Sequence, residues 1–145
     1  MRLKAFFIFI FFLLICVYHL QEYTPVFASD RGSYTFYLGS KSSSAKTVTA
    51  SAVDAKKTAK QLDGITGEKI FFEDKTYGEN YALKIVKNLN AKKVFSERVE
   101  NTVCEYYYTP KIYCFVLIKN KRVNLHVVKS VHGVSVATPL VFDGY

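Results

Sequence analysis

From Lys92 to its end, the chain is a nearly continuous series of short segments with the composition of β-strands. The segments are rich in β-branched and aromatic residues, and only a few turn-forming residues separate one from the next. They are Lys93–Val99, Val103–Thr109, Ile112–Ile118, Val123–Val128 and Val134–Ala137. Connections this short favour antiparallel pairing between neighbours in the sequence. We therefore expect an antiparallel meander at the centre of the fold.

Three segments earlier in the chain predict further strands. Ser33–Leu38 has the alternating pattern of a strand, and Lys46–Thr49 and Lys69–Glu73 are short runs of similar composition. The segment Gly39–Ala45 is rich in serine and has no large apolar side chain. It cannot contribute to a core, so we expect a loop there.

Two segments have the pattern of helices. In Glu79–Leu89 the apolar residues recur at the spacing that lines one helical face; they are Tyr81, Ala82, Ile85, Val86 and Leu89. A weaker candidate, Ser51–Leu62, begins with Ser51 and Asp54 at the spacing of a capping box, and Gly64 follows it. Together these elements predict an α+β domain, with an antiparallel sheet backed by one or two helices.

The N-terminus has the features of a targeting segment. Arg2 and Lys4 precede the apolar run Ala5–Val17, and Val26-Phe27-Ala28 has small or β-branched residues where signal peptidase recognises its substrate. We expect export, with a signal peptide at residues 1–28 and a single domain at residues 29–145. The alternative is an uncleaved segment that anchors the protein, although the run is short for a membrane span.

The chain carries a formal net charge of +8, and removal of the leader would change that value little. A basic exported protein favours anionic partners such as acidic wall polymers or phospholipid head groups. The other interpretation is an ordinary solvated surface, because the lysines are scattered among acidic residues. A nucleic-acid partner is disfavoured, since an exported protein rarely meets one.

Two cysteines follow the leader, in neighbouring predicted strands. A loop formed by Tyr108, Thr109 and Pro110 would place Cys104 opposite Cys114 on one face of a hairpin. In an oxidising compartment, a disulfide between them is one outcome. The other is a pair of buried thiols that act as small apolar side chains. Two cysteines without a C-x-x-C motif do not indicate a metal site.

Tyrosines and histidines are the remaining candidates for a ligand surface: Tyr106, Tyr108, Tyr113, His126 and His132. Clustered tyrosines can stack on sugar rings, and the two histidines would be neighbours if Val127–Val134 forms a hairpin. The alternatives are ordinary sheet packing for the tyrosines and two partly exposed histidines in a polar hairpin. The motifs G-x-S-x-G and H-E-x-x-H are absent from the sequence, so we assign no catalytic, cofactor-binding or metal-binding residue.

Three C-terminal motifs carry a resemblance to a known family. They are Tyr106–Lys111 (YYYTPK), Lys121–His126 (KRVNLH) and Gly133–Tyr145 (GVSVATPLVFDGY). This pattern resembles the small exported proteins of Gram-positive bacteria described as YwmB-like, or TATA-box-binding-protein-like. The resemblance implies a curved antiparallel sheet backed by helices, and it supplies no catalytic residue. The family name refers to likeness of fold, and export makes promoter binding implausible.

These observations predict an exported, non-catalytic binding or structural module of the cell envelope, either secreted or anchored by its N-terminal segment. Its partner would be an envelope protein or an anionic envelope component. The alternative is a secreted enzyme or inhibitor whose site is assembled from residues far apart in the sequence. A deep pocket with converging titratable groups would favour the enzyme, and an open apolar or basic surface would favour the binding module.

Overall fold

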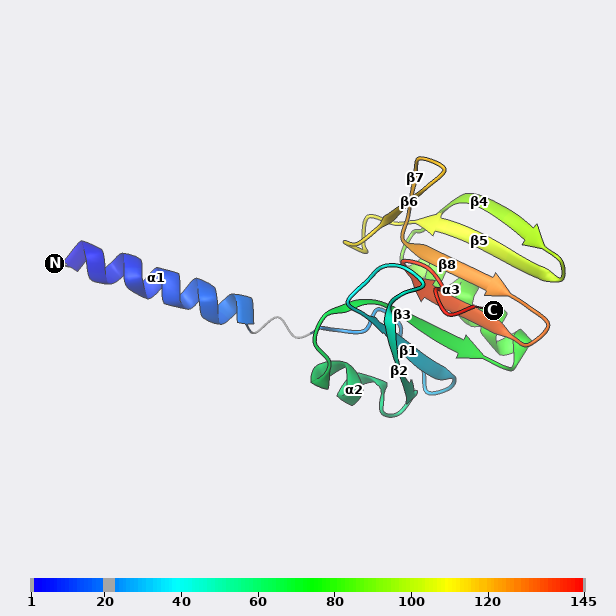
Figure 1. Cartoon of the computed structure of the whole chain (residues 1–145), viewed down its shortest axis with the longest axis horizontal. Coiled ribbons are helices and arrows are strands. Elements are labelled where there is room, and N and C mark those ends of the chain that lie inside the picture. The colour runs from blue at the N-terminus through cyan, green and yellow to red at the C-terminus, as the bar shows by residue number, and fades with distance from the viewer. Residues whose placement is uncertain (1, 20–22, 145) are drawn as a thin grey trace.

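The computed structural model describes residues 2–19 and 23–144. Parts of the expected leader and the last residue of the C-terminal motif, Tyr145, therefore lie outside the described residues. The N-terminal helix α1 (Arg2–His19) stands apart from the rest of the molecule (Figure 1). Its apolar side chains between residues 6 and 17 are exposed. All other elements surround one large sheet.

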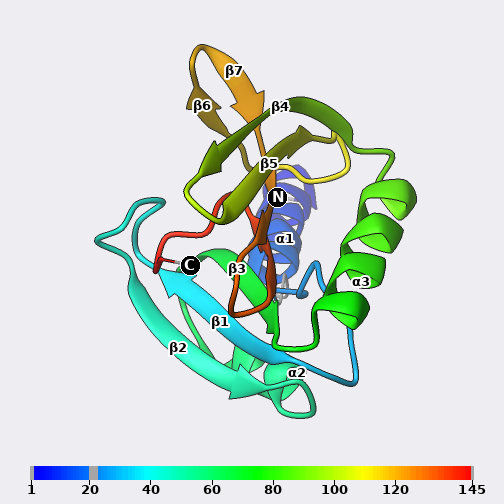
Figure 2. The same ribbon diagram turned by 90° about the vertical axis from the view of Figure 1, so that its right-hand side faces the viewer.

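The sheet has seven antiparallel strands in the order β2-β1-β3-β9-β8-β5-β4. Their bounds are β1 (Ser33–Leu38), β2 (Lys46–Ser51), β3 (Ile65–Phe72), β4 (Lys92–Val99), β5 (Thr102–Tyr108), β8 (Leu125–Lys129) and β9 (Val134–Thr138). The sheet is strongly curved, with β1 and β2 at one end and β4 and β5 at the other (Figure 2). The expected α+β fold with a curved antiparallel sheet is confirmed. β3 lies between β1 and β9, and so joins the N-terminal strands to the C-terminal ones.

Helix α3 (Lys75–Asn88) packs against β3, β8 and β9 at the centre of the sheet. It begins at Lys75 rather than Glu79, because the Asp74 carboxylate caps it by accepting a hydrogen bond from the Tyr77 amide at 3.0 Å. The expected apolar face is present. Tyr81 and Ala82 are buried, and the remaining members of the face pack against the same core.

Helix α2 (Ala55–Gln61) is shorter than expected, because β2 continues to Ser51. Ser51 and Asp54 do interact at its start. The Ser51 hydroxyl donates to the Asp54 carboxylate at 2.9 Å and accepts from the Asp54 amide at 3.3 Å. The Ser51–Asp54 pair therefore closes the turn that leads into the helix.

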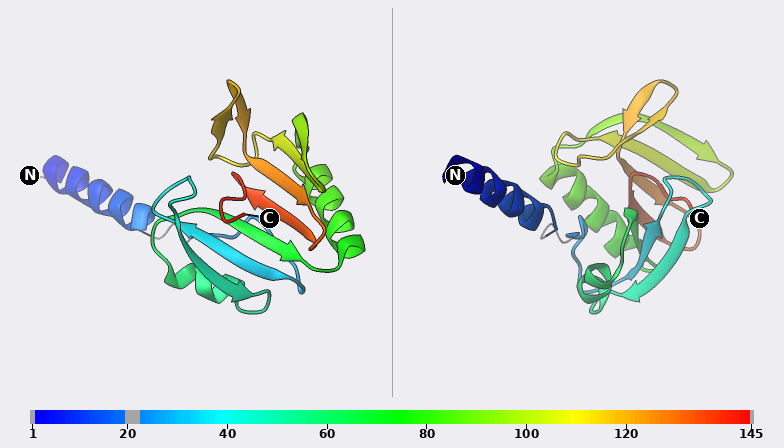
Figure 3. Two further views of the ribbon diagram at one scale, coloured as in Figure 1. Left: turned by 45° about the vertical axis from the view of Figure 1, so that its right-hand side comes forward. Right: turned by 60° about the vertical axis from the view of Figure 1, so that its left-hand side comes forward.

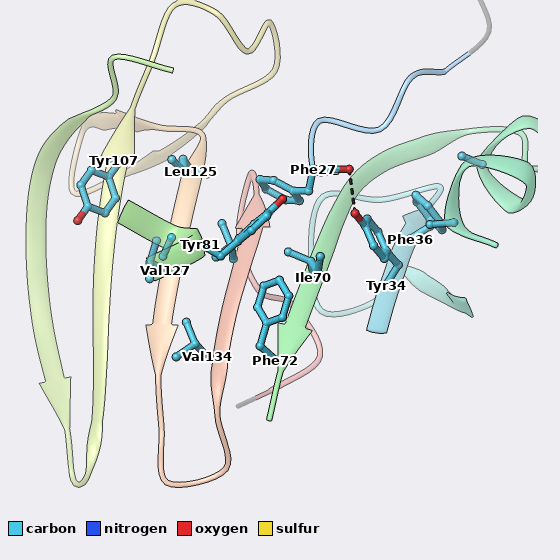
Figure 4. Packing of buried hydrophobic residues seen from close by; sticks show 14 residues of the cluster. Phe27, Tyr34, Phe36, Ile70, Phe72, Tyr81, Tyr107, Leu125, Val127 and Val134 are labelled. Atoms are coloured by element: carbon cyan, nitrogen blue, oxygen red, sulfur yellow. Dashed lines mark hydrogen bonds between the residues drawn. The ribbon is translucent and has the colours of Figure 1, made fainter. Parts of the chain in front are cut away.

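Both faces of the sheet are covered. The main core lies between the sheet and helices α2 and α3, and Figure 4 shows its side chains; they include Phe27, Tyr34, Phe36, Ile70, Phe72, Tyr81, Tyr107, Leu125, Val127 and Val134. A second, smaller cluster lies on the other face and includes Cys104, Tyr106, Val123, Val128, Ala137 and Val141. Successive residues of β5 and β8 therefore enter different clusters, as strand geometry requires.

The expected strand Ile112–Ile118 does not join the large sheet. Its last residues form β6 (Val116–Ile118), which pairs only with β7 (Lys121–Val123). The turn between them consists of Lys119 and Asn120, both with positive φ (51° and 60°), as expected for Asn120. The end of this hairpin projects beyond the large sheet in the left view of Figure 3, while Val116, Ile118 and Val123 pack in the second cluster. The chain then returns as β8, so the meander is β4-β5-β8-β9.

Asn124 explains this departure from the expected meander. Its side chain is fully buried between β7 and β8. The amide oxygen accepts from the Thr109 amide at 2.9 Å, and the amide nitrogen donates to the carbonyls of Thr109 (2.7 Å) and Ile112 (3.0 Å). These bonds fold residues 109–112 into an irregular loop in place of a tight hairpin turn. The chain therefore leaves the sheet after β5.

The register expected for the two cysteines is consequently wrong. Cys104 lies opposite Glu97 of β4 and Val128 of β8. Cys114 lies in the segment that precedes β6. Both side chains are thiols in the structure.

Candidate functional site: the projecting β6–β7 hairpin

Two of the five expected ligand-surface residues are buried. Tyr106 and His126 stack on each other within the second cluster, with ring centroids 4.4 Å apart and planes 12° apart. Nδ1 of His126 accepts a hydrogen bond from the Val141 amide at 3.1 Å. Burial lowers the pKa of His126 to about 4, so this imidazole is neutral at neutral pH. The expectation that His126 is partly exposed is wrong, because the C-terminal segment covers its face of β8.

The other three expected residues do not form one surface. Tyr113 is almost fully exposed and Tyr108 is half-buried. His132 is exposed in the β8–β9 loop, at the opposite end of β8 from the projecting hairpin. In the β8–β9 hairpin the residue paired with His126 is Ala137, so the two histidines are not cross-strand neighbours.

His132 instead lies at the edge of a hollow with Lys69, Ser135 and Asp143. The Asp143 carboxylate accepts hydrogen bonds from the Tyr37 hydroxyl and the Lys69 ammonium, each at 2.6 Å. Burial opposes its ionisation, but these two donors outweigh burial and lower the pKa of Asp143. This carboxylate therefore ties the C-terminal segment to the sheet. Both of its oxygens already accept hydrogen bonds in that role, and we assign no reaction to the hollow.

The segment before β6 and β6 itself alternate between inward and outward side chains. Ile112, Cys114, Val116 and Ile118 are buried or half-buried, whereas Tyr113, Phe115 and Leu117 are exposed. Exposure reaches 97% for Tyr113 and 64% for Leu117. Outward positions on a projecting strand are ordinarily polar. Of the exposed set, only Leu117 lies on β6; Tyr113 and Phe115, which is 38% exposed, lie in the irregular segment before the strand. These three apolar side chains, here called the row, form an exposed patch, and such a patch indicates an interaction surface.

Four basic residues lie in the same stretch of chain as this patch: Lys111, Lys119, Lys121 and Arg122. The guanidinium carbon of Arg122 lies 4.8 Å from the ring centre of Phe115. The Lys119 ammonium lies 4.8 Å from the ring centre of Phe95 and 3.7 Å from the Glu97 carboxylate. The segment Lys111–Arg122 contains no acidic residue. The hairpin therefore combines exposed apolar side chains with a local excess of positive charge.

The base of the hairpin lies beside the point where the chain enters the domain from α1. Tyr23 and Val26 line the same hollow as Tyr113 and Cys114. The exposed apolar helix α1 precedes Tyr23 in the chain (Figure 1). Residues from two distant parts of the sequence thus lie together on one side of the molecule.

A signal for this patch was present in the sequence. In Ile112–Ile118 both alternating sets are apolar, a pattern usual for a strand covered on both faces, and the run ends in the basic turn Lys119–Arg122. The sequence could not show that one set would lack a cover. That outcome depends on Asn124, which directs the chain away from the sheet.

Within the described residues, no group of three or more His, Cys, Asp or Glu side chains is placed to hold a metal ion. No family model matches the chain, and neither the curated proteins nor the solved structures contain a significant match. The resemblance to the YwmB-like proteins stays a prediction. In the part of the chain that the structure describes, no helix is both long and apolar enough to cross a membrane.

Proposed function

We propose that this chain is an exported, non-catalytic protein of the cell envelope that binds an anionic membrane surface with its β6–β7 hairpin. The observation that carries the proposal is the row Tyr113, Phe115 and Leu117, exposed on β6 and on the segment before it, with Arg122 against Phe115 and three lysines in the same stretch of chain. An aromatic and aliphatic row suits the boundary between head groups and acyl chains. Basic side chains beside it suit the phosphates of anionic lipids.

The expected strength of this contact is modest. Each Lys or Arg near an anionic membrane contributes about 1 kcal/mol, and full burial of a Leu or Phe side chain contributes about 1.5 to 3 kcal/mol. The row holds only three side chains, and Phe115 is already largely covered by the protein, so the apolar area available to the membrane is small. Such binding is weakened by salt, because screening reduces the contribution of the basic residues.

The hairpin base lies beside Tyr23, which follows α1 in the chain, and this position adds to the proposal. A leader that reaches the membrane during export would bring the hairpin base close to the same membrane, since Tyr23 lies beside Tyr113. A tethered contact of this kind gains from a high effective concentration. The hairpin would then fix the orientation of the domain on the membrane rather than supply all of the affinity.

Tryptophan fluorescence tests the proposal, because the sequence contains no Trp. Leu117→Trp in the full chain places one reporter on the row, and Val131→Trp places one in the exposed β8–β9 loop as a matched control. Both proteins are mixed with vesicles of brominated phosphatidylcholine, with or without phosphatidylglycerol. For Leu117→Trp we expect quenching and a blue shift of the emission only in the vesicles that also contain phosphatidylglycerol. Equal, solvent-like emission from both reporters in every vesicle would contradict the proposal.

A further inference from the structure

A short strap, defined here as residues 23–28, lies between helix α1 and β1 in the sequence and is built into the core. Phe27 is 2% exposed and packs in the main cluster with Tyr34 and Phe36, as Figure 4 shows. Tyr23 and Val26 pack against the same cluster. The expected domain boundary between Ala28 and Ser29 therefore falls after residues that belong to the folded domain.

A buried carboxylate holds the strap in place. Glu68 lies in β3, is fully buried, and accepts a hydrogen bond from the Phe27 amide at 2.8 Å. The Tyr23 hydroxyl donates to its other carboxylate oxygen. Both donors belong to the strap. Without the strap, the carboxylate would lose these partners while still facing an apolar interior, which is a strongly unfavourable arrangement.

Two further hydrogen bonds tie the strap to other elements. The Phe27 carbonyl accepts from the Tyr34 hydroxyl of β1 at 2.9 Å, and the Ala28 carbonyl accepts from the Tyr81 hydroxyl of α3 at 3.2 Å. The strap thus contacts β1, β3 and α3 at once. The hydroxyls of three buried or half-buried tyrosines, Tyr23, Tyr34 and Tyr81, therefore make hydrogen bonds that involve the strap.

We infer that the functional protein retains the strap, and that its N-terminus is not Ser29. Signal peptidase recognises residues on the N-terminal side of the cut, here Val26 and Ala28, in an accessible chain. In the folded domain Val26 packs against the core and Phe27 is buried. A chain that began at Ser29 would lack a core side chain and leave Glu68 without its strap partners. Processing at a site before Tyr23, or no processing, keeps the fold complete.

The first test identifies the N-terminus. The full chain, with a C-terminal tag, is produced in an exporting bacterial host, and the extracytoplasmic and membrane fractions are analysed by intact mass and N-terminal sequencing. We expect every folded species to contain Tyr23–Ala28. A species that begins at Ser29 and melts cooperatively near the temperature of the longer chain would overturn the inference.

The second test does not depend on processing. In the purified full chain, hydrogen exchange of residues 23–28 is compared with that of β3. We expect the amides of the strap to be protected from exchange about as well as those of β3. This protection should be lost in Glu68→Ala. It should be kept in the control Glu73→Ala, which changes an exposed carboxylate just beyond the end of the same strand. Exchange of the strap at the rate of an unstructured peptide in the unmutated protein would overturn the inference. This result is independent of membrane binding, so it separates failure of the strap from failure of the hairpin proposal.

Discussion

β1 and the segment Ile112–Ile118 both alternate between two sets of side chains, but only β1 is covered on both sides. In β1, Tyr34 and Phe36 enter the main core, and Tyr37 on the other face packs against Phe142 with ring centres 5.1 Å apart. In Ile112–Ile118 the outward set remains exposed. The comparison shows that an alternating apolar pattern specifies two faces, whereas the surrounding chain decides whether each face is covered.

The largest expected effect on the free energy of unfolding comes from truncating one apolar side chain in each of the two regions. Phe36→Ala removes a fully buried ring, and we expect it to lower the free energy of unfolding by about 3 to 5 kcal/mol. Leu117→Ala removes an exposed side chain and should change it by no more than about 0.5 kcal/mol. Chemical denaturation of the full chain in mild detergent measures both. Similar losses would mean that the hairpin row is part of a core.

Asn124→Ala tests why the two regions differ. The substitution leaves the Thr109 amide and two carbonyls without their partner in a buried site, and we expect a loss of about 3 kcal/mol. Asn101→Ala, in the exposed turn between β4 and β5, is the matched control and should have little effect. An Asn124→Ala protein as stable as the control would show that the irregular loop forms without this side chain.

The pH dependence of stability extends the comparison to Glu68, the buried carboxyl group that bonds the strap to β3. Burial raises the pKa of Glu68 to about 7 from an ordinary value of 4.5, even though the strap donates hydrogen bonds to its charged form. A raised folded-state pKa gives stability that is fully present below pH 4.5 and is lost as pH rises through about 7. Relative to Glu68→Gln, the unmutated protein should therefore lose stability over this range, by an amount on the order of 3 kcal/mol.

His126 titrates in the same range with the opposite sign. Its folded-state pKa of about 4 lies below the ordinary value of 6.5, so its contribution is present above pH 6.5 and is lost as pH falls through about 4. The difference between the unmutated protein and Glu68→Gln removes this shared term. The tyrosines near Glu68 stay neutral throughout, because burial raises the pKa of Tyr23, Tyr34 and Tyr81. A flat difference curve between pH 4.5 and 7 would show that Glu68 is not buried as described.

Charge reversal on the hairpin should have the smallest effect on stability. Lys119→Glu with Lys121→Glu changes exposed side chains and breaks the exposed Lys119–Glu97 ion pair, so the free energy of unfolding should fall by no more than about 1 kcal/mol. The same pair should abolish quenching of the Leu117→Trp reporter in phosphatidylglycerol vesicles. Lys56→Glu with Lys57→Glu, on α2, makes the same change in net charge away from the hairpin. If both pairs reduce quenching equally, the attraction comes from overall charge alone.

Local patterns predicted much of this fold. The bounds of β1 match the expected strand, the apolar face of α3 is the expected one, and Asn120 has the expected positive φ. Each of these features depends on residues close together in the sequence.

Features that depend on distant residues were not predictable in the same way. Where β5 pairs with β8, the Asn124 side chain bonds residues 109 and 112, and a single asparagine near the start of a predicted strand gives no sign of that role. Glu68 was missed because it follows Gly67 and precedes Lys69, a composition typical of a turn. It is covered by a strap about 40 residues earlier in the sequence, at the start of the domain. The strap itself resembles a peptidase site, so its local pattern indicates removal rather than packing.

The central claim is that the exposed side chains of Ile112–Ile118 bind a membrane surface. Its most direct test measures the depth of the Leu117→Trp reporter in the full chain, with phosphatidylglycerol vesicles that contain phosphatidylcholine brominated either near the head group or near the end of the acyl chain. We predict stronger quenching by the shallow bromines than by the deep ones, and little quenching of Val131→Trp by either. Emission from Leu117→Trp that stays solvent-like and matches that of Val131→Trp would contradict the claim.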